Sequence, residues 1–226
     1  MPAKVPDPGT APRRYSVTAS HASHAADQSA VELLAAESGL SKAKIKQAMA
    51  KGAVWREKLL PGGALGKPRR VRRATATLAP GDRLELFYNP VVLAAQCPEP
   101  VLMANRQCYS VWDKPAGMLC QGSRWGDHLT LNRYAEMHLP GKPAAFVVHR
   151  LDRMASGLVV LAHSKRAAAN LSRQFAERKV TKVYQCIVAG PAPAALPLVL
   201  DQPLEGKAAL TIVEQAMPAA QWVGHE

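Results

Sequence analysis

Residues 149–158 read His149-Arg150-Leu151-Asp152-Arg153-Met154-Ala155-Ser156-Gly157-Leu158. One apolar run, residues 144–148, leads into this stretch, and a second, residues 158–162, leads out of it. Both runs are short, bounded and rich in valine, which favours two buried strands over one helix. The sequence therefore predicts a polar loop fixed at both ends by a sheet, and loops on rigid scaffolds are common places for catalytic groups.

The carboxylate of Asp152 has two interpretations. Charged turns with ordinary surface ion pairs are common and need no function. This stretch, however, has no proline and has its only glycine near its end, so it is not a generic turn. Arg150 and Arg153 flank the carboxylate and would favour its ionised form. An ionised, positioned carboxylate is what a nucleophile requires, so Asp152 is the candidate catalytic residue.

The loop follows the pattern His-Arg-Leu-Asp-Arg-x-x-Ser-Gly-Leu, which resembles the signature of the RluA-type pseudouridine synthases. The family's catalytic Asp falls on Asp152, and the family usually has Thr where this chain has Ala155. The resemblance covers residues 109–190. It includes two further blocks at matching places, Asp113-Lys114-Pro115-Ala116-Gly117 and Lys182-Val183-Tyr184.

This resemblance implies an isomerase acting on RNA, with a mixed-sheet catalytic domain. In the family's reaction the N1–C1′ bond of uridine breaks, the uracil turns and C5 joins C1′, so neither a metal nor a cofactor is expected. Asp152 would act as nucleophile or as base at C2′, and the sequence leaves both open. Tyr184 would lie against the uracil and help to remove the C5 proton. Arg150 or Arg153 would contact the neighbouring phosphate or fill the space left by the flipped base.

The composition is that of a globular protein. The chain has 226 residues, 48% of them hydrophobic, which is enough for one large or two small domains. No apolar run approaches the roughly 18 residues that span a bilayer. The start of the chain lacks a charged-then-apolar signal pattern, so we expect a cytoplasmic protein, acting as a monomer. The four cysteines form no Cys-x-x-Cys pair, which argues against a zinc site or a disulfide framework.

The positive charge is concentrated in one segment. The formal net charge is +12, and residues 41–73 hold eleven Lys or Arg against one acid, Glu57. Such a cluster indicates a polyanion as partner, and RNA fits better than an anionic membrane because the segment lacks an apolar opposite face. The candidate RNA-binding residues are Lys42, Lys44, Lys46, Lys51, Arg69, Arg70, Arg72 and Arg73, together with Arg153 in the central loop.

In the first part of the chain, two predicted helices are followed by a small sheet that ends in Pro80-Gly81-Asp82-Arg83-Leu84-Glu85-Leu86, and this order resembles an S4 RNA-binding domain. Residues 1–27 are rich in Pro, Ala, Ser and His and are expected to form a disordered arm. Residues 28–90 predict helices at 29–37 and 41–51, followed by strands at 53–55, 72–78 and 83–88. Residues 91–106, with several prolines, are expected to be an irregular linker.

Residues 107–226 are assigned to the catalytic domain. The pattern predicts a strand from Tyr109, a helix at 129–138, a helix capped by Ser164, a strand at 180–188 centred on Tyr184 and a strand at 210–213. His128 is interpreted as a loop residue that makes hydrogen bonds, since no catalytic partner is identifiable. Family members normally continue through a block with a basic residue near the catalytic Asp. No counterpart is found here, so we expect the C-terminal part of the domain to be missing and synthase activity to be low.

The sequence thus predicts an α+β protein that isomerises uridines in ribosomal or transfer RNA. The alternative is an RNA-binding protein with weak or no catalysis, derived from a truncated synthase. A glycoside-processing enzyme is disfavoured, because its usual mechanism needs two carboxylates and the central loop offers only Asp152.

Overall fold

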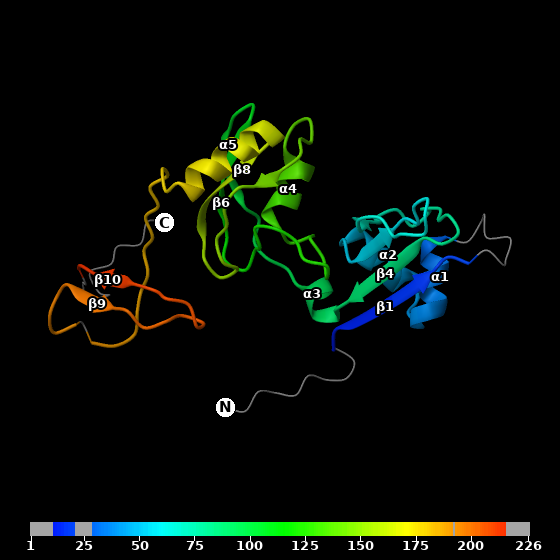
Figure 1. Ribbon diagram of the computed structural model, residues 1–226, viewed down its shortest axis with the longest axis horizontal. Coiled ribbons are helices and arrows are strands. Elements are labelled where there is room, and N and C mark those ends of the chain that lie inside the picture. Colours follow the sequence, from blue (N-terminus) through cyan, green and yellow to red (C-terminus); the bar gives the residue numbers. More distant parts are fainter. Residues whose placement is uncertain (1–10, 21–28, 192, 216–226) are drawn as a thin grey trace. The chain divides into compact units, whose positions relative to one another are not determined.

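The computed structural model describes residues 11–20, 29–191 and 193–215. The chain divides into two compact units, Met1–Val180 and Thr181–Glu226, which are described separately. Figure 1 shows the elements of both. Among the described residues, none of the helices combines the length and the apolar character needed to cross a membrane.

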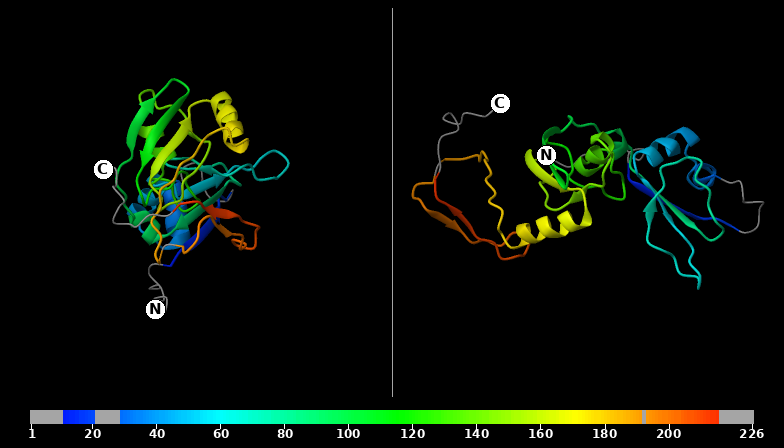
Figure 2. Two further views of the ribbon diagram at one scale, coloured as in Figure 1. Left: turned by 90° about the vertical axis from the view of Figure 1, so that its left-hand side faces the viewer. Right: turned by 90° about the horizontal axis from the view of Figure 1, so that it is seen from above.

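The first sheet has four strands in the order β1-β4-β2-β3, all antiparallel. They are β1 (Arg13–Thr18), β2 (Val54–Glu57), β3 (Arg69–Arg70) and β4 (Arg83–Tyr88). Both views in Figure 2 show the segment between β2 and β3 projecting from the sheet as a long loop. The predicted strands at 53–55 and 83–88 are therefore confirmed, the latter over its full length.

Helices α1 (Ala30–Ser38) and α2 (Lys42–Ala50) begin and end as their sequences predict. Ser29 and Glu32 form a reciprocal capping box at the start of α1, and Gly39 ends it at φ 67°. The Ser41 side chain accepts a hydrogen bond from the backbone N–H of Lys44 at the start of α2. These local signals fix both helices before any packing is considered.

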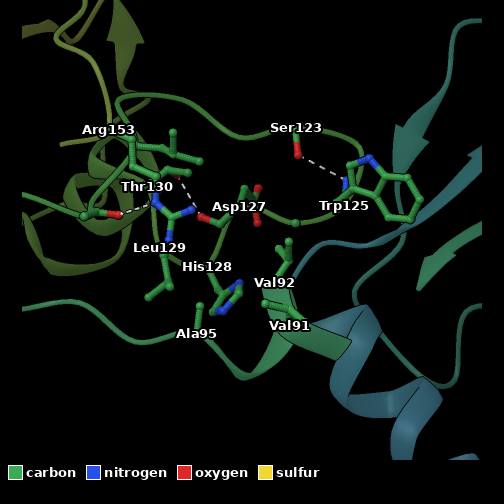
Figure 3. Close-up of a pocket in the computed structure, with 13 residues that line it drawn as sticks. Val91, Val92, Ala95, Ser123, Trp125, Asp127, His128, Leu129, Thr130 and Arg153 are labelled. Atoms are coloured by element: carbon green, nitrogen blue, oxygen red, sulfur yellow. Dashed lines mark hydrogen bonds between the residues drawn. The ribbon is translucent and has the colours of Figure 1, made fainter. Parts of the chain in front are cut away.

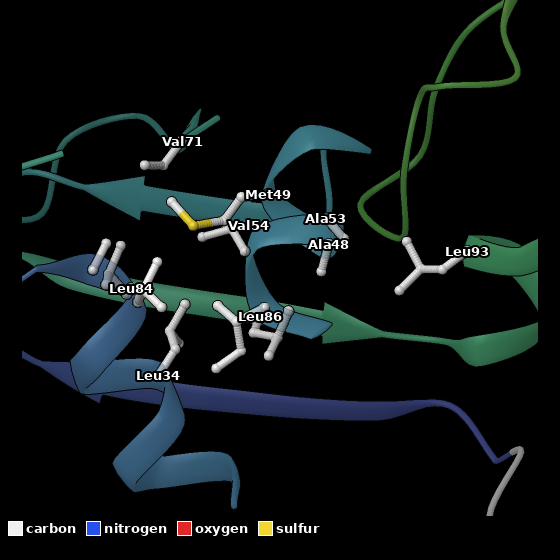
Figure 4. Close-up of a cluster of buried hydrophobic side chains, with 12 residues drawn as sticks. Leu34, Ala48, Met49, Ala53, Val54, Val71, Leu84, Leu86 and Leu93 are labelled. Carbon is white, nitrogen blue, oxygen red and sulfur yellow. The ribbon is translucent and has the colours of Figure 1, made fainter. Parts of the chain in front are cut away.

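One hydrophobic core joins these helices to the sheet (Figure 4). Leu34 of α1 and Met49 of α2 are fully buried against Val54 of β2 and Leu86 of β4. Burying each such side chain stabilises the fold by about 1.5–3 kcal/mol. This core holds the basic segment in a defined shape.

Two expectations for this region are wrong. The arm predicted to be disordered contains β1, which pairs with β4 along its whole length and places Tyr15 and Val17 against the core. The predicted strand at 72–78 is absent from the ladders, because this segment makes a turn closed by Ala76 N–H and Arg73 C=O, 3.1 Å apart. The rest of the predicted arm, residues 1–10 and 21–27, lies outside the described residues.

The second sheet carries the central loop. Its order is β5-β6-β8-β7, and every ladder in it is antiparallel, so the mixed sheet expected from the resemblance is not what the described residues form. The strands are β5 (Val101–Asn105), β6 (Tyr109–Lys114), β7 (Phe146–Val147) and β8 (Gly157–Ala162). Helix α4 (Leu131–His138) begins two residues later than predicted, and α5 (Lys165–Ala176) is capped by Ser164 as predicted. Trp112, Leu131 and Leu161 are buried in the core of this part.

The expected linker at 91–106 is also wrong. Residues Pro90–Ala94 form the short helix α3, where Asn89 caps the N-terminus and Pro90 occupies the first turn. Residues Val101–Asn105 form β5, which pairs with β6. The prolines thus begin a helix and precede an edge strand, both places that tolerate them.

The second unit contains a small antiparallel pair, β9 (Leu198–Leu200) and β10 (Thr211–Val213). The strand predicted at 210–213 is confirmed as β10. The strand predicted at 180–188 is not formed, and Val183 and Val188 there are 86% and 79% exposed. A β-rich sequence becomes a strand only where a neighbour completes the ladder, and within the described residues this segment has none.

Candidate functional site

The loop between β7 and β8 presents Asp152 to solvent. Its side chain is 88% exposed and forms an ion pair with Arg150, at 3.8 Å between Arg150 Nη2 and Asp152 Oδ1. The backbone N–H of Ala155 donates to the carbonyl of Asp152 at 3.2 Å and closes a tight turn. A weak, exposed ion pair leaves the carboxylate accessible to a ligand.

Residues on either side of Asp152 hold the loop in place. Leu151 is buried, and its backbone N–H lies 3.3 Å from the sulfur of Cys120, whose thiol is 3.5 Å from the carbonyl of Leu151. The His149 ring stacks on Phe175 of α5 at 4.2 Å between ring centroids. The backbone N–H of Val160 donates to Nε2 of His149 at 3.0 Å. The loop is therefore anchored on the residues preceding the exposed carboxylate.

Lys114 joins the loop to the turn after β6. Its side chain is fully buried, and its ammonium donates to the carbonyls of Pro115 and Met118 at 2.9 Å and of Arg153 at 3.4 Å. Burial lowers the pKa of Lys114 from its ordinary value, and neighbouring acidic groups oppose that change. In the sequence this block is marked only by the family resemblance, and no local pattern indicates that its lysine binds the central loop.

A second pair of contacts strengthens the same junction. The backbone N–H of Gly117 donates to the carbonyl of Arg153 at 2.7 Å, and Nε of Arg153 donates back to the carbonyl of Gly117 at 3.2 Å. Gly117 has φ 89°, a conformation that favours glycine. The block at 113–117 and the central loop at 149–158, separated in sequence, are thus joined beside Asp152 by several hydrogen bonds.

Tyr184 lies in the second unit. It is 62% exposed and belongs to the segment that forms no ladder in the described residues. Its place against a uracil beside Asp152 stays a prediction.

The candidate RNA-binding residues fall into two groups. The exposed group consists of Lys42, Lys44, Lys46, Arg69, Arg73 and Arg153, of which Lys42 also pairs with Glu32 at 2.9 Å. The other group is engaged within the chain: Lys51 donates to the carbonyl of Leu93, and Arg70 and Arg72 both pair with Asp127. The charge count alone could not separate these groups.

Asp127 receives both arginines in a closely packed setting. Its carboxylate lies 3.3 Å from Nε of Arg70, and Nη2 of Arg72 donates to the same oxygen. Gly52 and Gly122 lie so close to Asp127 that a Cβ atom on either would collide with its side chain. Asp127 therefore fixes the loop at 121–128 to the first sheet, a function that the sequence did not signal.

Aromatic contacts reinforce that attachment. Trp125 packs edge-to-face on Phe87 with ring centroids 5.5 Å apart. Nη1 of Arg124 lies 3.2 Å from the buried carboxylate of Glu85, and the indole N–H of Trp55 donates to the carbonyl of Arg124 at 3.0 Å. The basic segment and the loop next to the central motif are thus held together by several independent contacts.

A cavity of about 150 Å³ lies between α3 and the same loop (Figure 3). Its walls include Val91, Val92 and Leu129, with the ring of His128 among them and Arg153 at one side. Both ring nitrogens of His128 are buried without a hydrogen-bond partner in the part of the chain that the structure describes. The backbone of Ala95 opposes the lowering of the pKa of His128 that burial causes, and the hydrogen-bonding role expected for His128 stays a prediction.

The described residues hold no group of three His, Cys, Asp or Glu side chains that could bind a metal ion. The four cysteines, Cys97, Cys108, Cys120 and Cys186, are free thiols.

Comparisons with known proteins agree on one family. Residues 108–218 match the model of the RNA pseudouridylate synthase family. The dual-specificity RNA pseudouridine synthase RluA of Escherichia coli K12 is 37% identical over 123 residues, which are 51% of this chain and 52% of RluA. An uncharacterized RNA pseudouridine synthase of Chloroflexus aurantiacus is 29% identical over 145 residues, 61% of this chain and 46% of that protein.

The solved structure of human RNA Pseudouridylate Synthase Domain Containing 4 aligns with 35% of this chain and 30% of its own, at 26% identity and a TM-score of 0.29. The chain spans about half the length of the curated relatives it matches.

Proposed function

Residues 108–218 belong to the RluA-type pseudouridine synthases, and from this we propose that the protein converts uridine in RNA to pseudouridine, with Asp152 as the catalytic carboxylate. The observation that carries the proposal is the loop itself. It combines the family's ten-residue pattern with a carboxylate that is 88% exposed on an anchored backbone. A group that must reach the sugar of a nucleotide arriving from solvent needs both exposure and a fixed position.

The reaction places a simple demand on Asp152. The N1–C1′ bond breaks, the freed uracil rotates, and a C5–C1′ bond forms within the same nucleotide, after which the proton at C5 moves to N1. No atom is gained or lost, so no oxidant or co-reactant enters. One carboxylate can support this either by bonding to the sugar or by taking the C2′ proton, and the proposal includes both routes.

Access to the target requires an unpaired or flipped nucleotide. Arg150, with a side chain 70% exposed beside Asp152, is assigned to the phosphate next to the target or to the vacated stack. Arg153 directly follows Asp152 in the sequence and is also exposed. It is assigned the same two alternative roles as Arg150. Tyr184 is assigned to the uracil by the family's pattern alone.

RNA binding is assigned to the exposed lysine and arginine side chains of residues 41–73. Lys44, Lys46, Arg69 and Arg73 are exposed, and none of them has a salt bridge in the described residues. Phosphate contacts of this type give affinity without sequence selectivity and weaken as salt rises. We place this domain in the S4-like class and the target in ribosomal or transfer RNA of the cytoplasm.

The test is incubation of the chain with transcribed ribosomal and transfer RNA, followed by digestion to nucleosides and measurement of pseudouridine. Because the sequence predicts low activity, we expect pseudouridine to accumulate slowly, in one of the two RNA classes. If RNA binds but no pseudouridine forms in either, the synthase proposal fails and the chain is a binding protein.

A further inference from the structure

Arg14 and Arg124 lie over the same acidic side chain of the first sheet. Nε and Nη2 of Arg14 donate to Oε1 of Glu85, with 3.0 Å between Nε and that oxygen. Nη1 of Arg124 donates to Oε2 of Glu85 at 3.2 Å. The Glu85 side chain is 1% exposed, whereas those of Arg14 and Arg124 are 58% and 50% exposed. The two arginines thus cover a buried carboxylate and keep about half of their own surface in solvent.

The sheet and one aromatic ring fix the positions of both arginines. Arg14 of β1 is paired with Phe87 of β4, and Glu85 lies on the same face because residues two apart on a strand point the same way. The guanidinium carbons of Arg14 and Arg124 lie 5.6 and 5.4 Å from the centroid of the Phe87 ring, within the range of cation–π contacts. Trp125, next to Arg124, packs edge-to-face on that ring. Both arginines are therefore held in place before a ligand arrives, which lowers the entropic cost of binding one.

This cluster holds more positive charge than the burial of Glu85 requires. Arg14 alone supplies a full countercharge and two hydrogen bonds to the carboxylate. Arg124 adds a second cation, so one unit of positive charge remains. A guanidinium has five N–H donors. Among the described residues, side-chain hydrogen bonds engage two of these donors in Arg14 and one in Arg124, so both groups have donors left for an anion.

The cluster lies close to the central loop. Ser123 and Trp125, the neighbours of Arg124 in the chain, line the same cavity of about 150 Å³ as Arg153 (Figure 3). Arg153 directly follows Asp152. An RNA strand that presents a nucleotide to Asp152 can therefore also pass over Arg124.

We propose that Arg14 and Arg124 form a clamp for one phosphate group of the RNA backbone, on the strand whose uridine reaches Asp152. The proposal rests on the proposed action on RNA, and it adds a phosphate site outside the basic residues 41–73. A planar guanidinium binds phosphate through parallel N–H···O bonds, and a phosphodiester offers two free oxygens, so one phosphate can be shared by both groups. An anionic membrane fits less well, because Phe87, the apolar residue beneath both arginines, is buried.

The first measurement follows the arginine Nε–H signals by ¹H–¹⁵N NMR in Asp152→Asn, so that turnover has no part in it. The signals of Arg14 and Arg124 are assigned by their loss in Arg14→Gln and Arg124→Gln. We expect oligouridylate to shift both signals, and the shift of Arg14 to disappear in Arg124→Gln, because one phosphate needs both groups. Unshifted signals at saturation, or a shift of Arg14 that survives in Arg124→Gln, would overturn the proposal.

Inorganic phosphate is the second probe, because a site for a small anion would use the same chemistry. It should shift the two signals only at concentrations far above those at which oligouridylate acts, since the basic residues 41–73 hold the RNA but not a single phosphate. Saturation by inorganic phosphate at an equally low concentration would overturn the assignment to RNA.

The second measurement compares the affinities of Arg14→Gln, Arg124→Gln and Arg106→Gln for oligouridylate. Arg106, exposed after β5, is the matched control that loses the same charge. Each clamp variant should bind about tenfold more weakly than the parent, the effect of losing one charge-assisted contact, and the control should stay close to the parent. Both clamp variants leave Glu85 with one arginine, so they should still fold, and melting temperatures check this. Losses no larger than that of Arg106→Gln would overturn the clamp.

Arg124→Lys separates phosphate binding from a structural role. Lysine keeps the charge beside Glu85 but lacks the planar fork, so we expect it to keep the melting temperature and to recover part of the affinity lost in Arg124→Gln. If affinity follows the melting temperature across all variants, the arginines are structural and the clamp fails.

Pseudouridine assays on the parent separate this proposal from the proposed function. Pseudouridine formation with unshifted arginine signals would reject the clamp and keep the synthase activity. Shifted signals and weaker binding by the clamp variants, without pseudouridine formation, would do the reverse.

Discussion

Asp127 pairs with Arg72 across 55 residues of sequence. Arg70 pairs with the same carboxylate, so two arginines of the basic segment are engaged within the protein and are less available to contact RNA. Part of the positive charge that predicts a polyanion partner thus forms ion pairs that join the first sheet to the loop preceding α4. The two uses can be separated by mutation.

We expect Arg72→Ala to lower stability and Arg73→Ala to lower RNA affinity. Arg72→Ala leaves the buried carboxylate of Asp127 with fewer partners, which should cost about 2 kcal/mol in the free energy of unfolding. Arg73 is exposed, so its removal should leave the melting temperature unchanged and reduce the salt slope of RNA binding by about 1. Denaturant melts and binding at several salt concentrations measure both. The opposite pattern would place Arg72 on the RNA.

Replacing Lys44, Lys46, Arg69 and Arg73 together by Ser should flatten the salt dependence of RNA binding. Each contact to single-stranded RNA contributes about 0.7 to the slope, so four contacts give a loss of about 3. The control is the replacement of Lys165 and Arg166, which are exposed at the start of α5, far along the chain from this segment. An unchanged slope in the fourfold variant would place the RNA elsewhere.

Asp152→Asn should fold and bind RNA but form no pseudouridine. The substitution is nearly isosteric, and the side chain is 88% exposed, so its melting temperature should match that of the parent. The matched control is Asp201→Asn, an exposed carboxylate outside the family's blocks, which should keep the parent's turnover. Pseudouridine formation by the Asp152 variant at the parent's rate would exclude this carboxylate.

Lys114→Met should reduce turnover more than it reduces stability. Methionine fills a similar volume, but the carbonyls of Pro115, Met118 and Arg153 lose their shared donor. Hydrogen bonds to a charged group contribute about 1.5–3 kcal/mol, so the loop around Asp152 should loosen. Hydrogen exchange of the loop amides, read beside the melting temperature, tests this. Intact exchange protection at Gly117 and Ala155 would argue against the anchoring role.

His128 should make stability fall on the acid side of neutrality. Burial lowers its pKa in the folded state below the ordinary value of 6.5, so the unfolded chain binds more protons there. Stability then decreases as pH falls below about 6.5 and levels off once the folded-state pKa is passed. His128→Phe should show a smaller decrease than the parent over this window, and His138→Phe should follow the parent. Parallel curves for all three proteins would mean that His128 titrates alike in both states.

Local signals predicted most elements of the first unit. Ser29, Ser41 and Gly39 mark the ends of α1 and α2, and the alternation at Arg83–Tyr88 marks β4. Strand β1 was missed because its pairing partner lies about seventy residues further along the chain, and a composition rich in Pro and Ser around it hides the short alternation. The strand expected at 180–188 is not formed, because local β propensity does not ensure that a neighbouring strand is present to pair with it.

In the candidate site too, the residues of the local motif were found from the sequence, whereas residues that contact it from distant segments were not. Asp152 and its flanking arginines were named from the motif, and their catalytic role stays a prediction, since an exposed carboxylate is expected both of a catalytic loop and of a solvated charged turn. The supports of the loop, Lys114 and Cys120, were not predicted because their contacts are long-range and involve backbone groups. Cavities such as the one beside His128 arise from packing between distant segments and leave no pattern in the sequence.

Because Cys120 contacts the backbone of Leu151, the reactivity of this thiol can report opening of the central loop. Cys120 is 4% exposed, whereas Cys108 and Cys186 are exposed and would react with a thiol reagent at once. With those two and the partly exposed Cys97 replaced by Ser, slow labelling of Cys120 would occur only when Leu151 leaves the core, so its rate measures how often the loop opens. RNA that binds at Asp152 should slow that rate, so the labelling rate of Cys120 would report RNA binding at the loop.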